Sequence, residues 1–170
     1  MSNKGWKKLN RIVNKEDFSI IYTSTKEKVL VSTTDVPKIK NYTWCHNQGY
    51  ALTKQKNGNK YETIMMHRLI MNAPNDMLVD HINHDTLDNR RGNLRLASQM
   101  QNQMNQKMRI DNKSGVKGVS WNKSASKWTV YIRVNTERIY LGCFKNINDA
   151  KEARIQGEIK YFKKYRYMEV

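Results

Sequence analysis

The chain has 170 residues, 38% of them hydrophobic, which is enough for one domain or two small ones with small cores. It carries 31 Lys and Arg against 15 Asp and Glu, and the resulting net charge of +16 indicates a polyanionic partner. No stretch is long and apolar enough for a transmembrane helix, and the N-terminus lacks an apolar signal core. These features argue against a membrane protein and favour an intracellular one.

The positive charge is concentrated in the two ends of the chain. Residues 1–60 hold 12 basic and 4 acidic residues and residues 111–170 hold 13 and 6, whereas residues 61–110 hold 6 and 5. A basic excess alone also fits a ribosomal or membrane-surface protein. Cys45 and Cys143 stand alone in the sequence, so we expect reduced thiols that act as small core hydrophobes, and no structural zinc site.

The first third of the chain is predicted to be β-rich after a loosely held arm at residues 1–17. Two hairpins are indicated by short β-rich runs, Phe18–Tyr22 with Lys28–Ser32 and Tyr50–Thr53 with Tyr61–Met65. The second hairpin contains Asn57-Gly58, a pair that accepts positive φ at low cost and favours a tight turn. Three lysines of this hairpin fit either contacts with phosphates or a solvated tip: Lys54, Lys56 and Lys60.

The central segment is predicted to contain a short helix, then two strands joined by a polar loop, then a second helix. The first three elements are expected over Met66–Met71, Val79–Ile82 and Asn93–Ala97. Ser98 begins the second helix, because its hydroxyl can cap free backbone donors while Gln101 reaches back. Methionines recur every four residues along this helix and are expected to form a buried stripe: Met100, Met104 and Met108. Asn102 lies about one turn into the helix.

This order of strand, loop, strand and helix, with Asp80-His81 at the end of the first strand, resembles the ββα-metal or HNH nuclease family. The resemblance is to the branch whose last motif residue is Asn. It implies that His81 takes the proton from the attacking water, and that Asp80 and Asn102 hold one divalent cation. It also implies that Asn93 ties down the loop and orients the base. A neutral imidazole accepts a proton near pH 7, and carboxylate and amide oxygens suit Mg²⁺ or Mn²⁺.

Other interpretations of these residues stay open at this point. Asp80, His81 and Asn93 could be surface turn residues of an ordinary hairpin, since a short motif alone carries little weight. His84 stands where the family often has a small residue, and it fits either a solvated loop position or a role at the phosphate. His67 fits a packed, hydrogen-bonded histidine, a third metal ligand or a substrate contact.

The C-terminal third changes pattern after a polar, basic linker at residues 105–115. Three short strands are predicted, followed by a helix that Asn148 caps: Val116–Trp121, Lys127–Val134 and Arg138–Phe144. On the second strand, alternation with period two gives one apolar face and one basic, aromatic face. Small residues such as Ala150 and Gly157 let the helix lie close on the apolar face, which leaves the basic face open.

The runs Lys117-Gly118-Val119 and Tyr140-Leu141-Gly142, with the alanine-bearing helix, resemble the AP2 DNA-binding domain. That family presents its three-stranded sheet to the major groove. The residues that this resemblance places toward DNA are Lys117, Ser120, Tyr131, Arg133, Arg138 and Tyr140. Ser120 and Tyr131 stand where the family commonly has charged residues. The alternative is that these polar side chains only solvate the outer face of the sheet.

Together these patterns predict an α+β protein. N-terminal β-hairpins lead into a ββα-metal nuclease module (1–104), followed by a linker (105–115) and an AP2-like three-stranded antiparallel sheet with a helix (116–170). The resemblance implies a homing-type or phage-encoded endonuclease, in the cytoplasm of a bacterial host. It would hydrolyse phosphodiester bonds in double-stranded DNA with one divalent metal ion, Mg²⁺ or Mn²⁺. No small-molecule substrate is expected and a monomer is favoured. A non-catalytic DNA-binding regulator and an RNA-binding protein are the alternatives.

Overall fold

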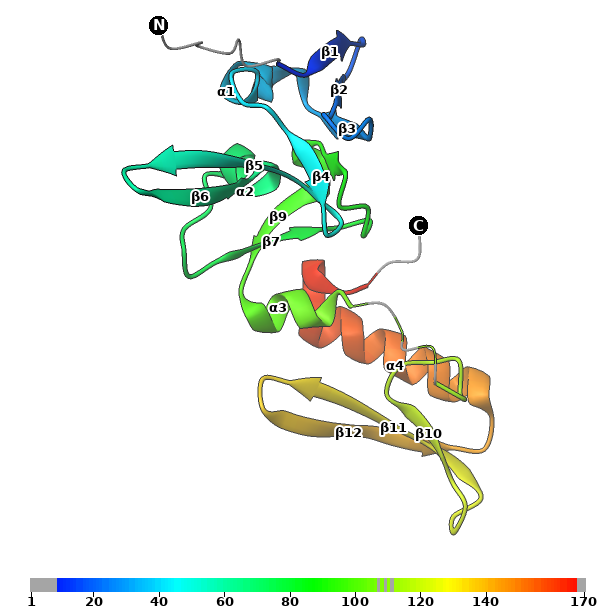
Figure 1. Ribbon diagram of the computed structural model, residues 1–170. Coiled ribbons are helices and arrows are strands. Elements are labelled where there is room, and N and C mark those ends of the chain that lie inside the picture. Colours follow the sequence, from blue (N-terminus) through cyan, green and yellow to red (C-terminus); the bar gives the residue numbers. More distant parts are fainter. Residues whose placement is uncertain (1–8, 107, 109, 111, 168–170) are drawn as a thin grey trace, which may run out of the picture. The chain divides into compact units, whose positions relative to one another are not determined.

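The computed structural model describes residues 9–106, 108, 110 and 112–167, and its fold is mixed α+β (Figure 1). The chain divides into two compact units, Met1–Ser98 and Gln99–Val170. This division places the helix after Ser98 in the second unit. The predicted bounds of the nuclease module (1–104), the linker (105–115) and the C-terminal domain (116–170) stay predictions. No helix in the described ranges is long and apolar enough to cross a membrane.

The described part of the first unit contains three small sheets. Their strand orders are β1-β2-β3-β8, β4-β5-β6 and β7-β9. The strands are β1 (Arg11–Asn14), β2 (Ser19–Tyr22), β3 (Lys28–Val31), β4 (Cys45–Asn47), β5 (Tyr50–Asn57), β6 (Lys60–Met65), β7 (Leu78–His81), β8 (Asp88–Asn89) and β9 (Leu94–Ala97). The helices are α1 (Val36–Ile39) and α2 (Met66–Met71), with 3-10 turns η1 (Thr33–Asp35) and η2 (Arg91–Asn93).

The core of the first unit forms because apolar residues alternate along β2 and β3 and meet apolar residues of the helices. Buried members of this core are Ile21, Val29, Val31, Ile39, Trp44, Met66 and Ile70. The predicted hairpin of β2 with β3 is confirmed. The prediction of a loose arm is wrong for Arg11–Asn14, which pairs with β2 as β1. Residues 1–8 of that arm lie outside the described residues.

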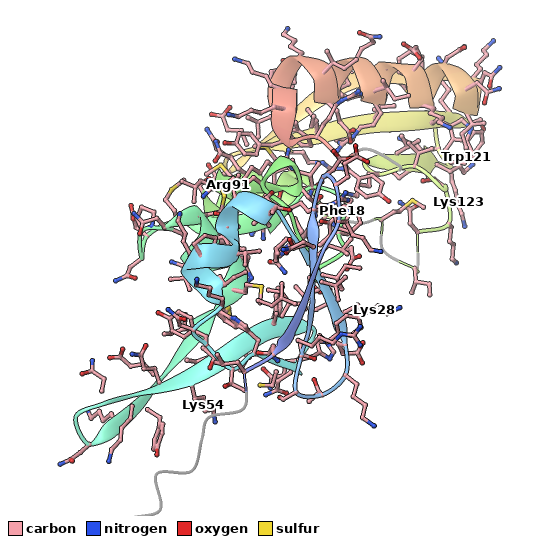
Figure 2. All side chains as sticks on the ribbon, turned by 90° about the horizontal axis from the view of Figure 1, so that it is seen from above. Phe18, Lys28, Lys54, Arg91, Trp121 and Lys123 are labelled. Atoms are coloured by element: carbon pink, nitrogen blue, oxygen red, sulfur yellow. The ribbon has the colours of Figure 1, made fainter. Side chains whose placement is uncertain are left out.

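The predicted hairpin of β5 with β6 is also confirmed, with one difference in its turn. Asn57 pairs with Lys60, so Gly58 occupies the first turn position, where its φ is +59°. The pairing also separates the lysines, because Lys54 and Lys56 share one face of the hairpin and Lys60 points to the other. Figure 2 shows this hairpin, with Lys54 labelled, extending from the rest of the first unit, and the side chains of residues 54–63 are exposed.

The second unit contains a three-stranded antiparallel sheet of order β10-β11-β12, with one long helix along one face (Figure 1). Its elements are α3 (Gln99–Met104), β10 (Val119–Asn122), β11 (Lys127–Val134), β12 (Glu137–Phe144), α4 (Ile147–Phe162) and η3 (Lys163–Tyr165). Ala150 and Gly157 are buried, and a Cβ added at Gly157 would collide with the side chain of Leu141. The close approach of α4 to the apolar face is therefore confirmed.

Two details of the second unit differ from the sequence-based expectation. Asn146, and not Asn148, caps α4, because its side-chain oxygen accepts a hydrogen bond of 2.8 Å from the Asn148 N–H. The first strand begins at Val119 and not at Val116. The preceding Gly118 has φ +68°, which takes the chain out of the extended conformation that a strand needs.

The prediction of a buried methionine stripe on α3 is wrong. Met100 is 40% exposed and Met108 is 41% exposed, and no residue of α3 is buried. The helix ends at Met104, so Met108 lies beyond it and cannot share a helical face with Met100.

A buried arginine joins α4 to the sheet, and sequence reasoning did not single it out. The guanidinium of Arg154 donates to the carbonyl of Tyr131 and forms an ion pair of 2.8 Å with Glu158. It lies against Gly118, where an added Cβ would collide with both the guanidinium and the Tyr131 carbonyl. The left-handed backbone and this close approach together require glycine at residue 118.

Candidate functional site

The β7 and β9 ribbon of the first unit positions the two central candidate residues. The register pairs Asp80 with Arg95 and His81 with Leu94, so His81 is the last residue of its strand. Adjacent side chains on a strand point to opposite faces, so Asp80 and His81 lie on different sides of the ribbon. Asp80 is 6% exposed and His81 is 5% exposed. Neither residue is a solvated turn residue.

The carboxylate of Asp80 faces Arg95 on the neighbouring strand. The Arg95 Nε and Nη2 atoms lie 2.8 and 2.7 Å from Asp80 Oδ2. Both side chains are largely buried, which makes this a strong charge-assisted contact. Sequence reasoning missed Arg95, because the register between two predicted strands cannot be read from their residues. A cation held by Asp80 would have to share this carboxylate with Arg95.

His81 lies in a small aromatic cluster with His67 of α2 and Tyr50 of β5. The two imidazole rings are edge to face with centroids 5.2 Å apart, and the Tyr50 ring is 5.3 Å from His67 and 6.2 Å from His81. Burial lowers the pKa of His67 to about 4, and the charges of His81 and Arg68 act in the same direction. His67 is therefore a packed, neutral histidine at pH 7.

The electrostatics of His81 suit a proton acceptor. Burial lowers the pKa of His81, although a hydrogen bond from its ring to Asn89 and the charges of Asp80, Asp85 and Asp88 oppose that effect. His81 Nε2 lies 3.3 Å from Asn89 Oδ1. Because the pKa lies below its ordinary value near 6.5, the imidazole is mostly neutral at pH 7 and can accept a proton.

Asn93 connects the two ends of the loop that follows His81. Its side-chain oxygen accepts from the Asn83 N–H at 2.9 Å, and its side-chain nitrogen donates to the Asp88 carbonyl at 2.8 Å. The Asn93 carbonyl also accepts from the Ile82 N–H at 2.9 Å. These bonds fix the backbone directly after His81. His84, inside this loop, has φ +64° and donates its backbone N–H to the His81 carbonyl.

The loop is also held from outside by the N-terminal sheet. β8 pairs in parallel with β3, with Leu30 opposite Asp88 and Val31 opposite Asn89. Arg91 forms two hydrogen bonds of 2.8 and 2.7 Å with the buried carboxylate of Asp35. Asn89, which contacts His81, is therefore held in a strand and not in a free loop.

Asp88 has a structural role in the same loop. Burial alone would raise the pKa of Asp88, but hydrogen bonds from Arg90 and Asn83 outweigh burial and lower it. Arg90 reaches this carboxylate with Nε at 2.8 Å and Nη2 at 2.7 Å. Asp88 is thus an ionised anchor for the loop that carries Asn83.

The predicted second metal ligand, Asn102, lies on α3 in the second unit and is half-buried. Within residues 9–106, 108, 110 and 112–167, no three His, Cys, Asp or Glu side chains gather into a metal-binding cluster. The carboxylate of Asp80 and the side-chain oxygen of Asn102 are each hard donors of the kind that suits Mg²⁺ or Mn²⁺. Their joint role as ligands of one cation stays a prediction.

The second unit presents the residues that were predicted to contact DNA. Tyr131 pairs with Tyr140, and Arg133 pairs with Arg138, so these four side chains share one face of the sheet with Ser120. This face is opposite the one that packs on α4, because Val119, Val130 and Ala150 form the core on the other side. Lys117 differs, since it precedes β10 and is not part of the sheet.

We call the face that carries Ser120, Tyr131, Arg133, Arg138 and Tyr140 the open sheet face. Its aromatic and cationic groups are stacked together. The Arg138 guanidinium lies 3.7 Å from the centroid of the Tyr131 ring, and the Tyr131 and Tyr140 rings are 5.4 Å apart. Tyr140 is 56% exposed. Stacked rings next to cations are suited to contacts with bases and phosphates.

Comparison with known proteins supports a nuclease. Residues 66–104, which include α2, β7, β9 and α3, match the family model described as HNH endonuclease. An uncharacterized HNH endonuclease of Acanthamoeba polyphaga mimivirus, L560, is 49% identical over 49 residues, which are 29% of this chain and 26% of that protein. Protein 3.8 of Escherichia phage T7 is 40% identical over 55 residues, which are 32% of this chain and 46% of that protein.

These matches cover only part of each protein. The similarity spans less than half the length of both relatives. None of the solved protein structures matches the chain. The matched family residues end before the β10-β11-β12 sheet, so the AP2-like character of that sheet stays a prediction.

Proposed function

We propose that this chain is a metal-dependent DNA endonuclease of the HNH type, with His81 as its general base. The observation that carries the proposal is the buried imidazole of His81 at the end of β7, with a pKa held below its ordinary value. It lies within the residues that match the HNH endonuclease model. The side-chain hydrogen bonds of Asn93 hold the loop that follows His81, so we assign Asn93 the role of positioning this base.

In the proposed reaction, His81 accepts a proton from a water molecule that attacks the phosphorus of a DNA phosphodiester. The bond to the 3′ oxygen breaks, which leaves a 5′ phosphate and a 3′ hydroxyl. Asp80 and Asn102 would hold one divalent cation, Mg²⁺ or Mn²⁺. When bound, such a cation stabilises negative charge on the phosphate and on the leaving oxygen.

Duplex DNA is the proposed partner because both ends of the chain are strongly basic while residues 61–110 are nearly neutral. The open face of the β10-β11-β12 sheet is proposed to contact the major groove in the manner of an AP2 domain. With one proposed site per chain, a monomer would cut one strand. We propose a phage-encoded or homing-type enzyme that acts in the cytoplasm of a bacterial host, consistent with the similarity to a phage T7 protein.

A non-catalytic DNA-binding regulator is the second candidate. The contact of Asp80 with Arg95 favours it, since a carboxylate already occupied by an arginine is a weaker metal ligand. Incubation of supercoiled plasmid DNA with the protein, with and without Mg²⁺, separates the two candidates. Metal-dependent nicking supports the endonuclease, and DNA binding without any nicking supports the regulator.

Substitution of the proposed ligands is expected to change the metal dependence of cleavage. Asp80→Ala and Asn102→Ala should each shift the Mg²⁺ titration of nicking to higher concentrations, because one of two protein ligands is lost. Excess metal should restore Asn102→Ala better than Asp80→Ala, since the carboxylate also supplies negative charge. Asp76→Ala removes an exposed carboxylate near β7 and is the matched control. An unchanged titration in both variants would place the metal elsewhere.

Substitution of arginines on the open sheet face is expected to weaken DNA binding without changing the rate of the cleavage step. Arg133→Ala and Arg138→Ala should each lower affinity, and a lost phosphate contact should reduce the slope of log affinity against log salt by about 0.9. A base contact would instead cost about 1 to 3 kcal/mol at one sequence position. Fluorescence anisotropy at several salt concentrations measures both effects. Lys151→Ala, on the exposed side of α4, should leave affinity unchanged, and equal losses in all three variants would contradict a specific face.

A further inference from the structure

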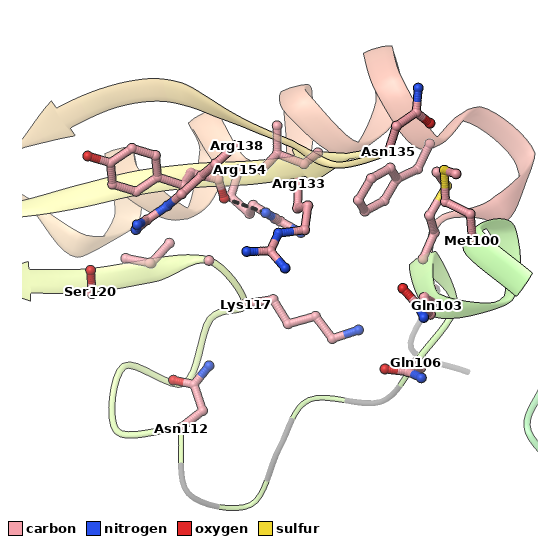
Figure 3. A pocket seen from close by; sticks show the side chains of 16 residues that line it. Met100, Gln103, Gln106, Asn112, Lys117, Ser120, Arg133, Asn135, Arg138 and Arg154 are labelled. Carbon is pink, nitrogen blue, oxygen red and sulfur yellow. Dashed lines mark hydrogen bonds between the residues drawn. The ribbon is translucent and has the colours of Figure 1, made fainter.

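A pocket of about 670 Å³ opens within the second unit, beside the beginning of β10, where β11 continues past the residues that pair with β10 (Figure 3). The backbone N–H of Tyr131 on β11 donates to the carbonyl of Gly118, the residue directly before β10. Beyond this point the pocket is bordered by Lys117 from the chain before β10, Arg133 from β11, Arg154 from α4, and Gln103 from α3. Its volume lies in the range of about 300 to 1,000 Å³ that is typical of small-molecule sites.

The charge of this pocket is strongly positive. Lys117, Arg133, Arg138 and Arg154 line it, and no Asp or Glu is among the described residues that do. Glu158 neutralises Arg154 in part. The side chain of Arg133, in contrast, is exposed and has no hydrogen bond or ion pair within the described residues. Several cations around one cavity repel each other, so a bound anion would be stabilised there.

Lys117 lines the pocket and is half-buried. Its ammonium lies 5.0 Å from the centroid of the Tyr167 ring. Burial lowers the pKa of Lys117, and the charge of Arg154 adds to this effect while Glu158 opposes it. Figure 3 shows the Lys117 side chain reaching across the pocket toward Gln103 and Gln106. An anion between Lys117 and Arg133 would relieve the electrostatic cost of burying this cation.

The rest of the lining is uncharged, with amide groups and apolar side chains. Gln103 and Asn135 supply hydrogen-bond donors and acceptors, and Met100 and Phe162 supply apolar surface. A phosphate ion alone would use only the cations and would leave most of this volume empty. A nucleotide uses all parts, since its phosphate needs cations and its base needs amide edges and an apolar surface.

We propose that this pocket binds one unpaired nucleotide of a DNA strand, with its phosphate between Lys117 and Arg133. The proposal rests on DNA as the proposed substrate. The pocket shares Arg133, Arg138 and Tyr131 with the open sheet face, and it adds Lys117, Gln103 and Met100, which are not part of that sheet. Because a paired base is stacked inside the duplex and must leave the stack to enter a pocket, the ligand is a nucleotide at a single-stranded or opened position.

The test is calorimetric titration of the full-length protein with thymidine 5′-monophosphate, without metal. Thymidine and inorganic phosphate are the comparison ligands. The nucleotide should bind more tightly than either one. Lys117→Gln and Arg133→Gln should each weaken it by about ten- to a hundredfold, which is the effect of one charge-assisted hydrogen bond. Lys117→Arg keeps the charge and should retain most of the affinity, and Lys151→Gln should bind like the original protein.

Each other outcome overturns a defined part of the proposal. Equal affinity for inorganic phosphate would mean a site for phosphate only. Failure of single-stranded oligothymidylate to displace the nucleotide would mean a site for free nucleotides and not for DNA. If Lys117→Gln does not fold, the Arg133→Gln variant tests the proposal instead. The exposed Arg133 side chain makes no hydrogen bond or ion pair within the described residues, so its loss should not disturb folding. Since no cleavage is measured, absence of binding would leave the nuclease proposal standing, and an inactive nuclease would leave this pocket standing.

Discussion

His81→Ala is expected to reduce cleavage of supercoiled DNA by about 10² to 10⁴-fold, the usual contribution of a positioned general base. DNA affinity should stay nearly unchanged, because His81 is buried in the first unit and is not proposed to hold DNA. Nicking assays under single-turnover conditions measure the rate, and anisotropy measures the affinity. His46→Ala is the matched control, since His46 lies on β4 outside the aromatic cluster and should keep full activity.

The pH dependence of the rate tests the same residue independently. A general base must be neutral, and the pKa of His81 lies below its ordinary value near 6.5 because burial disfavours the charged form. The rate should therefore fall to half of its plateau value at a pH below 6.5. A half-maximal rate above pH 6.5, or a His81→Ala protein that cuts at the original rate, would remove His81 from the mechanism.

Arg154→Met is expected to lower the free energy of unfolding of the second unit by about 3 to 5 kcal/mol, the usual cost of breaking a buried ion pair. Glu158 would lose its partner while its side chain is only 15% exposed, and the Tyr131 carbonyl would lose a donor. Urea unfolding followed by tryptophan fluorescence measures the change, because Trp121 and Trp128 lie in this unit.

A double variant distinguishes the ion pair from simple loss of packing. Arg154→Met combined with Glu158→Leu removes both charges, so it should recover much of the lost stability. Lys151→Ala, an exposed position on the same helix, should change stability by no more than about 0.5 kcal/mol. An Arg154→Met protein that unfolds at the original urea concentration would show that this arginine does not hold α4 to the sheet.

Elements with a strong local pattern could be predicted from the sequence. The strand over Lys127–Val134 has the same bounds in the structure as in the prediction, because period-two alternation is complete along it. The helix over Met66–Met71 also agrees. The methionine spacing failed as a guide, because a period of four residues does not reveal where a helix ends. The cap at Asn146 was missed because Asn148, two residues further, offers the same side chain.

For the candidate site too, sequence patterns identified residues of a local motif and missed residues whose contacts are long-range. The positions of Asp80, His81 and Asn93 followed from a motif in one stretch of sequence. Arg95 and Asn89 did not, because their contacts with Asp80 and His81 depend on strand register and on the pairing of β8 with β3. Such pairings join residues far apart in the chain, and no pattern in either segment identifies its partner.

The parallel pairing of β8 with β3 also has a consequence for the order of folding. Val31 pairs with Asn89, so more than fifty residues of chain must be enclosed before this contact can form. Contacts over such a long separation form late, after the local hairpins. During synthesis, the loop beside His81 thus remains unassembled until nearly the whole first unit has emerged from the ribosome. For the proposed nuclease, a nascent chain would therefore lack an organised general base until this pairing has formed.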